Sequence, residues 1–574
     1  MVQTKLISQL MITTFVVALF TSILTFASNY AYSTSQFPTQ EDFWKNKITP
    51  MLFNEMENNF SDSIQRNIQR NIQKDDLSVI VYLKQQADLT NLIKGVTFKN
   101  REEQTSFVRK ILVNVAKTSQ PALVKWLSEN KINFQRFYIS NMIALFDITP
   151  EIVYQLAQRE DVAKITLNSK FKALPDRGLV DLNFDQRFDQ RFDQQFDQQF
   201  EQLFDLELDD LESSLDPNYI SIFKHKGVGA NISSTGADRV WNELKIRGQG
   251  IVVAGQDTGI DWQHPALVRQ YRGNITGNVA NADHSYSWHD SIKQAIGSGS
   301  NSCGYNLKSP CDDNGHGSHT MGSIVGDDGN GNQIGMAPNA KWIGCRNMDA
   351  GVGRPSTYIE CFEWFLAPYP QGKDPMAFGD PTKAPHVINN SWGCDSSEGC
   401  KDAEILPVLK SLMAAGIMVV ASAGNDGSAC STIKTPPAMH SEETLSVGAH
   451  NHSSGTIASF SSRGPSVYDN GVGPDVTAPG VNIRSSTPGG NYSGFMWSGT
   501  SMAGPHVVGE VALIWSANNK LIGKISETVN IVRKTATAKT TSETCGGVAG
   551  NKIPNNTYGY GAINAYSAVK SALK

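Results

Sequence analysis

The spacing of apolar residues divides this 574-residue chain into two regions with different element patterns. In the first, Ser78–Lys84 is an apolar, β-branched run without breakers and predicts a strand. Phe107–Asn130 carries apolar residues at helical spacing and predicts one or two helices. Two more strands, a helix opened by proline and a last strand are expected over Phe134–Ile148, Pro150–Arg159 and Val162–Leu167. This mixture predicts a small α+β domain over residues 75–170.

From Asn231 onward the pattern changes to short apolar runs separated by helix-like stretches such as Ala403–Ala415. Runs of this kind are typical of strands that are buried on both faces of a parallel sheet. They are Gly250–Ala254, Val387–Asn389, Gly416–Ala421 and Thr444–Ala449. Because strands and helices alternate, residues 231–574 are expected to form a three-layer α/β domain with a mostly parallel sheet.

Residues 171–230 connect the two regions, and residues 183–205 repeat the units FDQR, FDQR, FDQQ, FDQQ and FEQL. Phenylalanine recurs at every fourth position from Phe184 to Phe200. A period of four drifts by about 40° per step around a helix of 3.6 residues per turn, so no single face stays apolar. The segment therefore favours a low-complexity acidic linker. A docking strip for a partner, or for the chain itself, is the alternative that the sequence leaves open.

Residues 1–33 have the pattern of an export signal. Lys5 precedes an uncharged, mostly apolar run from Leu10 to Ala27, and small residues follow it. An uncleaved membrane anchor is the alternative, because a run of this length is near the lower limit for a span. With the signal cleaved, the protein is expected to be secreted and to have no stable membrane association.

The cysteines agree with export. All eight lie at or beyond Cys303, and an even number in this half indicates structural disulfides in an oxidising compartment. Eight cysteines allow 105 connectivities; short loops favour two individual pairs, and the other four residues would then form two more. The expected pairs are Cys303–Cys311, Cys394–Cys400, Cys345–Cys361 and Cys430–Cys545. A zinc site is disfavoured because no CxxC pair occurs.

Charge excludes one class of partner. The net charge is −5 and the chain has no run of Lys or Arg, so no nucleic-acid partner is expected.

Three motifs in the second region carry candidate chemistry. Asp257 ends an apolar strand and begins D-T-G, at the sheet edge where ligands gather in open α/β folds. His316 lies in N-G-H-G-S-H, and the H-E-x-x-H pattern of a metal site is missing. Ser501 lies in S-G-T-S-M-A-G-P-H, at the expected N-terminus of a helix. An aspartic protease would need a second D-T/S-G, which the chain lacks.

These residue types suit acyl transfer. A serine hydroxyl is a poor nucleophile until a base takes its proton, and the base needs a carboxylate to orient it. Ser501, His316 and Asp257 supply these three roles, and His319 is expected to be a packed histidine. Asn425, after another buried strand, is the candidate oxyanion donor together with the Ser501 N–H. A binding protein on an inactive protease fold is the alternative.

The order Asp, His, Ser, with D-T-G, H-G-S-H and G-T-S-M-A, resembles the subtilisin-like serine proteases, and among them bacillopeptidase F-like members. The resemblance covers residues 231–574 and implies a serine endopeptidase acting on proteins or peptides. It also implies substrate binding by Ser391, Trp392 and Gly393, with no cofactor for the chemistry. The first region is similar to the family's inhibitory propeptide, which implies a self-processing zymogen whose mature form starts near residues 215–235.

Many members of that family bind structural calcium, and one loop has suitable oxygen atoms. The candidate ligands are Asp327, Asp328, Asn330 and Asn332. A merely solvated turn is the alternative. The aromatic stretch from Asp349 to Pro385 is expected to be an elaborated surface near the cleft, and the Trp392 ring to fill part of a substrate pocket or to pack outward.

Overall fold

The computed structural model describes residues 46–56, 77–172, 227–297, 299–394, 400, 405–493 and 497–574. The chain forms two compact units, Met1–Ile48 and Thr49–Lys574, and the second contains nearly all the described residues. The expected signal (1–33) and the Phe-Asp-Gln repeats (183–205) lie outside the described residues. No described helix is both long enough and apolar enough to cross a membrane.

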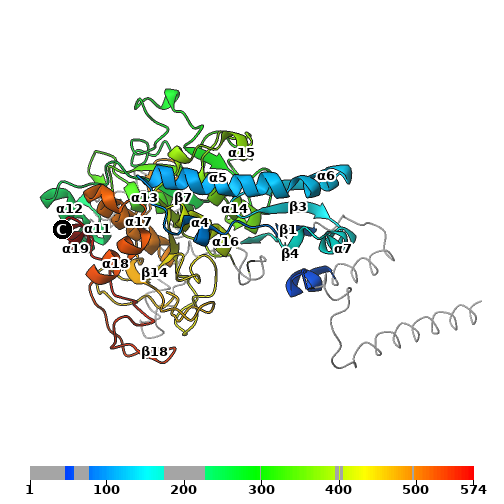
Figure 1. Cartoon of the computed structure of the whole chain (residues 1–574). Coiled ribbons are helices and arrows are strands. Elements are labelled where there is room, and N and C mark those ends of the chain that lie inside the picture. The colour runs from blue at the N-terminus through cyan, green and yellow to red at the C-terminus, as the bar shows by residue number, and fades with distance from the viewer. Residues whose placement is uncertain are drawn as a thin grey trace, which may run out of the picture. The chain divides into compact units, whose positions relative to one another are not determined.

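An α+β subdomain occupies the first part of the second unit (Figure 1). Its antiparallel sheet has the order β2-β3-β1-β4. The strands are β1 (Leu77–Leu83), β2 (Asn133–Phe137), β3 (Met142–Ile148) and β4 (Val162–Leu167). The helices are α4 (Leu89–Ile93), α5 (Arg101–Ser119), α6 (Pro121–Glu129) and α7 (Pro150–Gln158). The predicted strands and helices are confirmed, and two helices form because α6 starts anew at Pro121.

A seven-stranded sheet forms the centre of the second part, with the order β15-β14-β13-β12-β7-β10-β8. Every neighbouring pair is parallel, which confirms the predicted α/β architecture. The strands are β7 (Val252–Asp257), β8 (Trp288–Asp290), β10 (Lys341–Arg346), β12 (Val387–Asn390), β13 (Met418–Ser422), β14 (Leu445–His450) and β15 (Val476–Pro479).

Helices cover both faces of this sheet, which explains why nearly every residue of its strands is buried. Alternate residues enter two separate cores: Val253 and Val420 lie in one, and Ala254 and Val419 in the other. The first core contains α12 (Ala237–Glu243), α13 (His316–Val325), α17 (Thr500–Ala517), α18 (Ile525–Thr535) and α19 (Ala565–Ala572). The second contains α14 (Pro355–Leu366) and α16 (Leu406–Ala414).

Short elements complete the described structure. The strands are β5 (Phe171–Lys172), β6 (Gly227–Val228), β9 (Asn332–Gln333), β11 (Val352–Gly353), β16 (Ser486–Thr487), β17 (Asn491–Tyr492), β18 (Thr544–Cys545) and β19 (Val548–Ala549). The helices are α11 (Ala230–Ser234), α15 (Pro375–Phe378), η1 (Val279–Asn281), η2 (Pro381–Lys383) and η4 (Asn519–Leu521). Four disulfides join the cysteines in the expected pairs, Cys303–Cys311, Cys345–Cys361, Cys394–Cys400 and Cys430–Cys545.

The α+β subdomain lies against α14 and α16 of the larger one. Their buried residues share one core, which includes Ile80 and Phe137 on one side and Phe362 on the other. Glu363 Oε2 accepts hydrogen bonds from the backbone N–H groups of Tyr138 and Ile139, at 2.5 and 2.9 Å. At the end of the subdomain, β5 pairs antiparallel with β11 of the larger domain.

One expectation about this region is wrong. The stretch from Asp349 to Pro385 was expected at the surface, but every residue of α14 is buried, and Trp364 and Phe365 are fully so. The reason is that α14 lies between the seven-stranded sheet and the α+β subdomain, so both of its faces are covered. Phe378, beyond that helix, is half exposed.

Candidate active site

The candidate residues come from elements that meet at one edge of the seven-stranded sheet. Asp257 is the last residue of β7, and Asn425 follows the end of β13. His316 begins α13 and Ser501 is the second residue of α17, two helices that pack on each other over the same face. Because all strands are parallel, their carboxyl ends share one edge, where such folds place their ligands.

Asp257 and His316 form a close pair. His316 Nδ1 lies 2.8 and 2.9 Å from the two carboxylate oxygens of Asp257, and both side chains are buried. The approach depends on Gly317, where a Cβ atom would lie 2.0 Å from the Gly259 carbonyl oxygen. The glycine after the histidine is therefore required by the contact between the α13 start and the turn after β7.

The pair defines the chemistry of the imidazole. Because Nδ1 faces a carboxylate, the neutral ring carries its proton there and keeps a lone pair on Nε2. Burial lowers the pKa of His316, but the Asp257 carboxylate and its hydrogen bond, with the Asp312 carboxylate, raise it overall above 6.5. The ring is thus suited to act as a base through Nε2 at neutral to alkaline pH.

Ser501 makes a different hydrogen bond from the one expected. Its Oγ donates to the backbone oxygen of Ser391 at 3.0 Å, and no described hydrogen bond joins it to His316. A catalytic hydrogen bond is often absent until substrate binds. A rotation about χ1 is the movement that redirects a serine hydroxyl between such partners.

The backbone around Ser501 has an unusual support. Pro505 lies inside α17, so the Ser501 carbonyl lacks the N–H donor that a residue four positions later normally provides. The Ser391 hydroxyl fills this gap and donates to the Ser501 oxygen at 2.9 Å. Ser391, predicted as a substrate-binding residue, therefore also holds the segment that carries the serine.

Asn425 lies beside the start of α17. Its Oδ1 accepts hydrogen bonds from Thr500 N at 2.9 Å and from Thr500 Oγ1 at 2.8 Å. These contacts orient the amide, and no described residue accepts a hydrogen bond from its Nδ2. The first-turn N–H of Ser501 has no partner within its helix. Two donors, a side-chain amide and a backbone N–H, are thus available near the serine.

Trp392 does not face solvent. It is buried and stacks on Tyr358 of α14, with ring centroids 4.2 Å apart. Gly393 lies close to Thr435, whose Oγ1 would be 2.5 Å from an added Cβ. The indole therefore joins the core beneath the β12 end, and the outward alternative is wrong.

His319 is packed, as the sequence predicts. It is fully buried, its Nε2 lies 3.1 Å from the Ile483 oxygen, and its ring stacks on Trp497. Burial lowers its pKa to about 3, so it stays neutral. Trp497 lies 6.3 Å from the His316 ring between centroids. Trp497 was not among the residues expected at the site, although its place four residues before Ser501 is a signal.

The candidate calcium loop is held by other contacts. Asp327 pairs with Arg247 and Arg269 at 3.1 and 3.2 Å. Asp328 accepts hydrogen bonds from the backbones of Asn330 and Asn332. The oxygen atoms therefore face cations and donors of the protein, and this donor set does not fit a calcium ion. No group of His, Cys, Asp or Glu in the described ranges is arranged to hold a metal.

A buried Asp–His pair, with a serine at the N-terminus of a neighbouring helix on a parallel sheet, is the arrangement of a serine hydrolase. Comparison with known proteins gives the family. A match to the Subtilase family, described as Peptidase_S8, covers residues 248–561. This is more than half of the 574 residues, and the chain belongs to the subtilase family of serine endopeptidases.

Three curated relatives show the extent of the likeness. The chain is 37% identical over 354 residues to bacillopeptidase F of Bacillus subtilis, which covers 60% of this chain but 22% of the relative. It is 32% identical to serine protease AprX of the same species, over 59% of this chain and 71% of the relative. Subtilisin E is 33% identical over 47% of this chain and 56% of its own length. The chain thus spans about a fifth of the first of these relatives and over half of the other two.

Proposed function

We propose that this protein is a secreted serine endopeptidase that hydrolyses peptide bonds through an acyl-enzyme. The observation that carries the proposal is the buried pair of Asp257 and His316. Asp257 binds Nδ1 of the imidazole and leaves Nε2 available, at the same edge of the sheet as Ser501. Membership of the subtilase family supports the same activity.

The residues divide the work between them. The Nε2 atom of neutral His316 takes the proton of Ser501 Oγ as that oxygen attacks the carbonyl carbon of the peptide. The C–N bond then breaks, and the imidazolium returns the proton to the leaving amine. Asp257 orients the ring and stabilises its positive charge in between. Water repeats the sequence on the ester and releases the acid.

The developing negative charge needs donors that are already in place. Asn425 Nδ2 and the Ser501 N–H are the two candidates, because Thr500 fixes the Asn425 amide by its oxygen. Removing one such donor in an acyl-transfer enzyme costs roughly 100- to 1,000-fold in kcat. The same fall is expected for Asn425→Ala.

The peptide substrate is proposed to bind as an extra strand. The edge formed by β11 already pairs antiparallel with β5, through Val352–Lys172 and Gly353–Phe171. Gly353 has no room for a side chain, since a Cβ atom would lie 2.5 Å from the Tyr358 ring. Ser391–Gly393 would form the other side of the strand's path.

The pairing of β5 also supports a zymogen. The α+β subdomain of residues 75–170 is proposed to be an inhibitory propeptide, because it covers α14 and α16 and ends on the edge strand that a substrate would use. Self-cleavage is proposed to occur in the linker of residues 171–230, so that the mature form starts near residues 215–235. Export follows from the signal pattern of residues 1–33.

A fluorophosphonate probe tests the proposal on the full chain after self-processing. We expect labelling of Ser501, loss of labelling in Ser501→Ala, and full labelling in the matched control Ser498→Ala. Ser501→Ala should also leave the linker uncut, and N-terminal sequencing of the secreted wild type gives the processing site. A processed wild-type protein that neither reacts with the probe nor cleaves casein would contradict the proposed function.

A further inference from the structure

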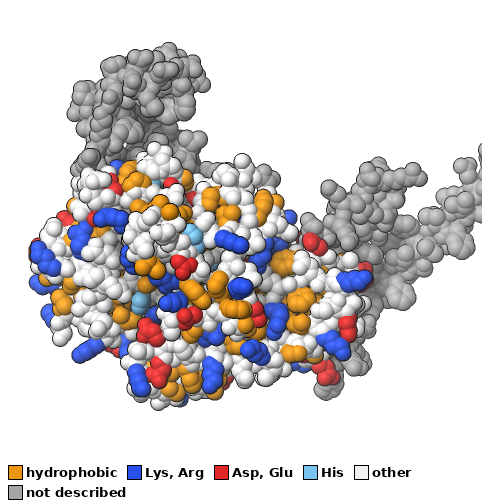
Figure 2. Space-filling model, turned by 90° about the horizontal axis from the view of Figure 1, so that it is seen from above, with side chains coloured by type: hydrophobic (Ala, Val, Ile, Leu, Met, Phe, Trp, Pro, Cys, Tyr) orange, Lys and Arg blue, Asp and Glu red, His pale blue; other side chains and the backbone are white. Residues whose placement is uncertain are grey.

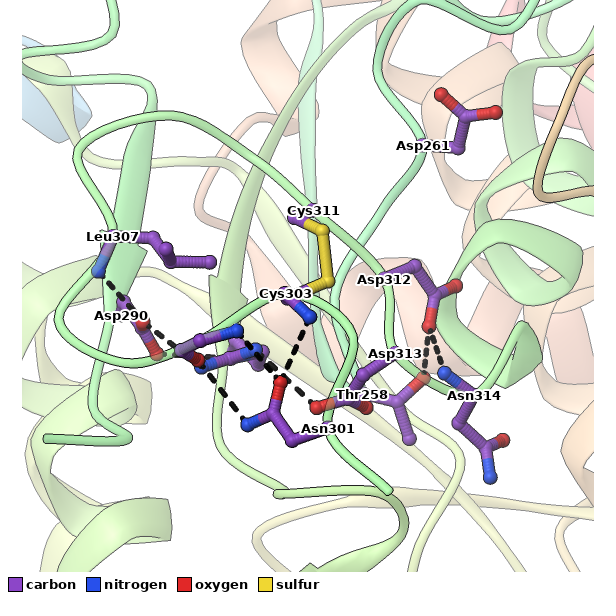
Figure 3. Close-up of a disulfide and its surroundings, with 12 residues drawn as sticks. Thr258, Asp261, Asp290, Asn301, Cys303, Leu307, Cys311, Asp312, Asp313 and Asn314 are labelled. Carbon is purple, nitrogen blue, oxygen red and sulfur yellow. Dashed lines mark hydrogen bonds and ion pairs between the residues drawn. A yellow bond between two sulfur atoms is a disulfide. The ribbon is translucent and has the colours of Figure 1, made fainter. Parts of the chain in front are cut away.

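Asp312 gathers five hydrogen bonds at the start of α13, although it plays no part in the proposed proton transfers. Its Oδ1 accepts from Thr258 Oγ1 at 2.8 Å, Gly315 N at 2.8 Å and Asn314 N at 3.1 Å. Its Oδ2 accepts from Ser318 N and Ser318 Oγ, at 2.9 and 2.7 Å. Figure 3 shows the carboxylate between Thr258 and Asn314. A carboxylate there satisfies helix donors that Gly315, with no side chain, cannot cap.

The same carboxylate reaches back to the strand that carries Asp257. Thr258 follows Asp257, and its N–H donates to Asp257 Oδ1 at 2.7 Å. Its hydroxyl donates to Asp312 and accepts from Gly317 N at 3.1 Å. Thr258 and Asp312 therefore connect the end of β7 to the first turn of α13, on which His316 stands.

The loop that carries Asp312 is anchored on both sides. Immediately before it, Cys311 is joined to Cys303 by a disulfide (Figure 3). The Cys311 carbonyl oxygen would lie 1.8 Å from a Cβ atom added to Gly259. Immediately after it, Asp313 accepts from the fully buried Arg346 at 3.2 Å. A loop held in this way presents the Asp312 carboxylate at a defined place.

We propose that Asp312 is a positioning residue for peptide hydrolysis: it holds the first turn of α13 against the end of β7, and so keeps His316 at hydrogen-bond distance from Asp257. The inference rests on the proposed function, because it concerns the efficiency of the same base. Displacement of a reacting group by about 1 Å can cost roughly 100-fold in rate.

Charge adds a second effect that a purely structural role would lack. The titratable groups that face His316 are Asp257 from β7, Asp312 from the preceding loop and His319 from its own helix. Burial lowers the pKa of His316, while the two carboxylates raise it. Loss of the Asp312 charge should therefore move the acid limb of the pH–rate profile to lower pH.

The test compares Asp312→Asn with wild type and with Asp261→Asn, each produced as the full chain and assayed after self-processing. Asp261→Asn is the matched control because it also removes one negative charge. In the described structure the Asp261 carboxylate accepts a hydrogen bond from Gly489 N and none from α13. Active sites are counted with the fluorophosphonate probe, so unfolded molecules do not enter kcat. We expect kcat of Asp312→Asn to fall about 10- to 100-fold with KM within about twofold. Its acid limb should shift downward, and Asp261→Asn should match wild type.

A second pair of variants covers the case in which Asp312→Asn fails to fold or to process itself. Thr258→Val keeps the shape of the side chain and removes both hydroxyl contacts, whereas Thr258→Ser keeps them. We expect a several-fold lower kcat for valine and a near wild-type value for serine. Wild-type kcat and an unshifted acid limb in Asp312→Asn, or equal kcat in the valine and serine variants, would overturn the inference. An inert wild-type protein would instead remove the proposed function itself.

Discussion

The support of the Ser501 carbonyl gives a prediction that can be worked through from the structure. Pro505 deprives this carbonyl of its helical donor, and the Ser391 hydroxyl replaces that donor at 2.9 Å. Ser391 is fully buried, so Ser391→Ala leaves the acceptor without water as a substitute. It also takes an acceptor away from Asn389 Nδ2, which donates to Ser391 Oγ at 2.9 Å.

The expected size follows from these two lost contacts. A buried polar group left without a partner costs about 1–3 kcal/mol, so about 2 kcal/mol is expected for Ser391→Ala. For a domain of this size each kcal/mol lowers the thermal midpoint by roughly 2 °C, which gives a fall of about 4 °C.

A second substitution isolates the contact with the Ser501 carbonyl. Pro505→Ala restores the backbone N–H that can donate to that oxygen. In this background Ser391→Ala should cost about 1 kcal/mol less, because only the contact with Asn389 is then lost. The difference between the two backgrounds is the coupling energy of a double-mutant cycle.

The assay is thermal unfolding of the full chain carrying Ser501→Ala, which prevents self-digestion and leaves the Ser501 backbone intact. All four members of the cycle are scanned at one fixed rate, because unfolding of such proteins is often irreversible. Equal losses on Ser391→Ala with proline and with alanine at position 505 would refute the reasoning, as would no loss at all.

Three further predictions concern pH, metal and the subdomain contact. Burial lowers the pKa of His316, but the Asp257 carboxylate outweighs burial and raises that pKa above 6.5. Because hydrolysis needs the neutral ring as base, the rate should fall as pH drops through a midpoint above 6.5. A pH–rate profile with a midpoint below 6.5 would contradict this. Arginine side chains occupy the oxygen atoms of Asp327, so EDTA should leave the thermal midpoint unchanged, whereas Arg247→Ala should lower the free energy of unfolding by about 1 kcal/mol. A clear fall of the midpoint with EDTA, reversed by calcium, would show a metal site. Glu363→Ala removes the acceptor of two N–H groups of the α+β subdomain, whereas Glu363→Gln keeps an oxygen there. Protease activity should therefore appear from the full chain about tenfold faster with Glu363→Ala than with Glu363→Gln. Equal rates for both variants would count against a role of this contact in inhibition by the subdomain.

The local sequence pattern was sufficient to predict most helices and strands. Val387–Asn389 and Thr444–Ala449 are uncharged runs that become β12 and β14, and they are buried at every position because both faces of the sheet are covered. Three strands of the same sheet were not recognised. β8 has only three residues, WHD, β10 begins at the exposed Lys341, and β15 contains Pro479, so none of them stands out as a continuous apolar run.

Burial of α14 shows where pattern reasoning fails. Its aromatic residues suggested a surface near the cleft, yet the helix is covered by the sheet on one side and by the α+β subdomain on the other. A sequence lists what a helix presents on its faces, but the partner on each face comes from a distant part of the chain. On the face drawn in Figure 2, side chains of both signs are interspersed, which fits the modest net charge.

The order of residues alone determined the class of chemistry, because a carboxylate after a strand, a histidine between glycines and a serine before a helix each depend on neighbours a few positions away. Tertiary structure decided which contacts these groups make. It gave Ser501 the Ser391 carbonyl as its partner and tied Asp312 to Thr258, across 54 residues of chain. The physical reason is that hydrogen bonds and burial depend on distance in space, which separation along the chain does not encode.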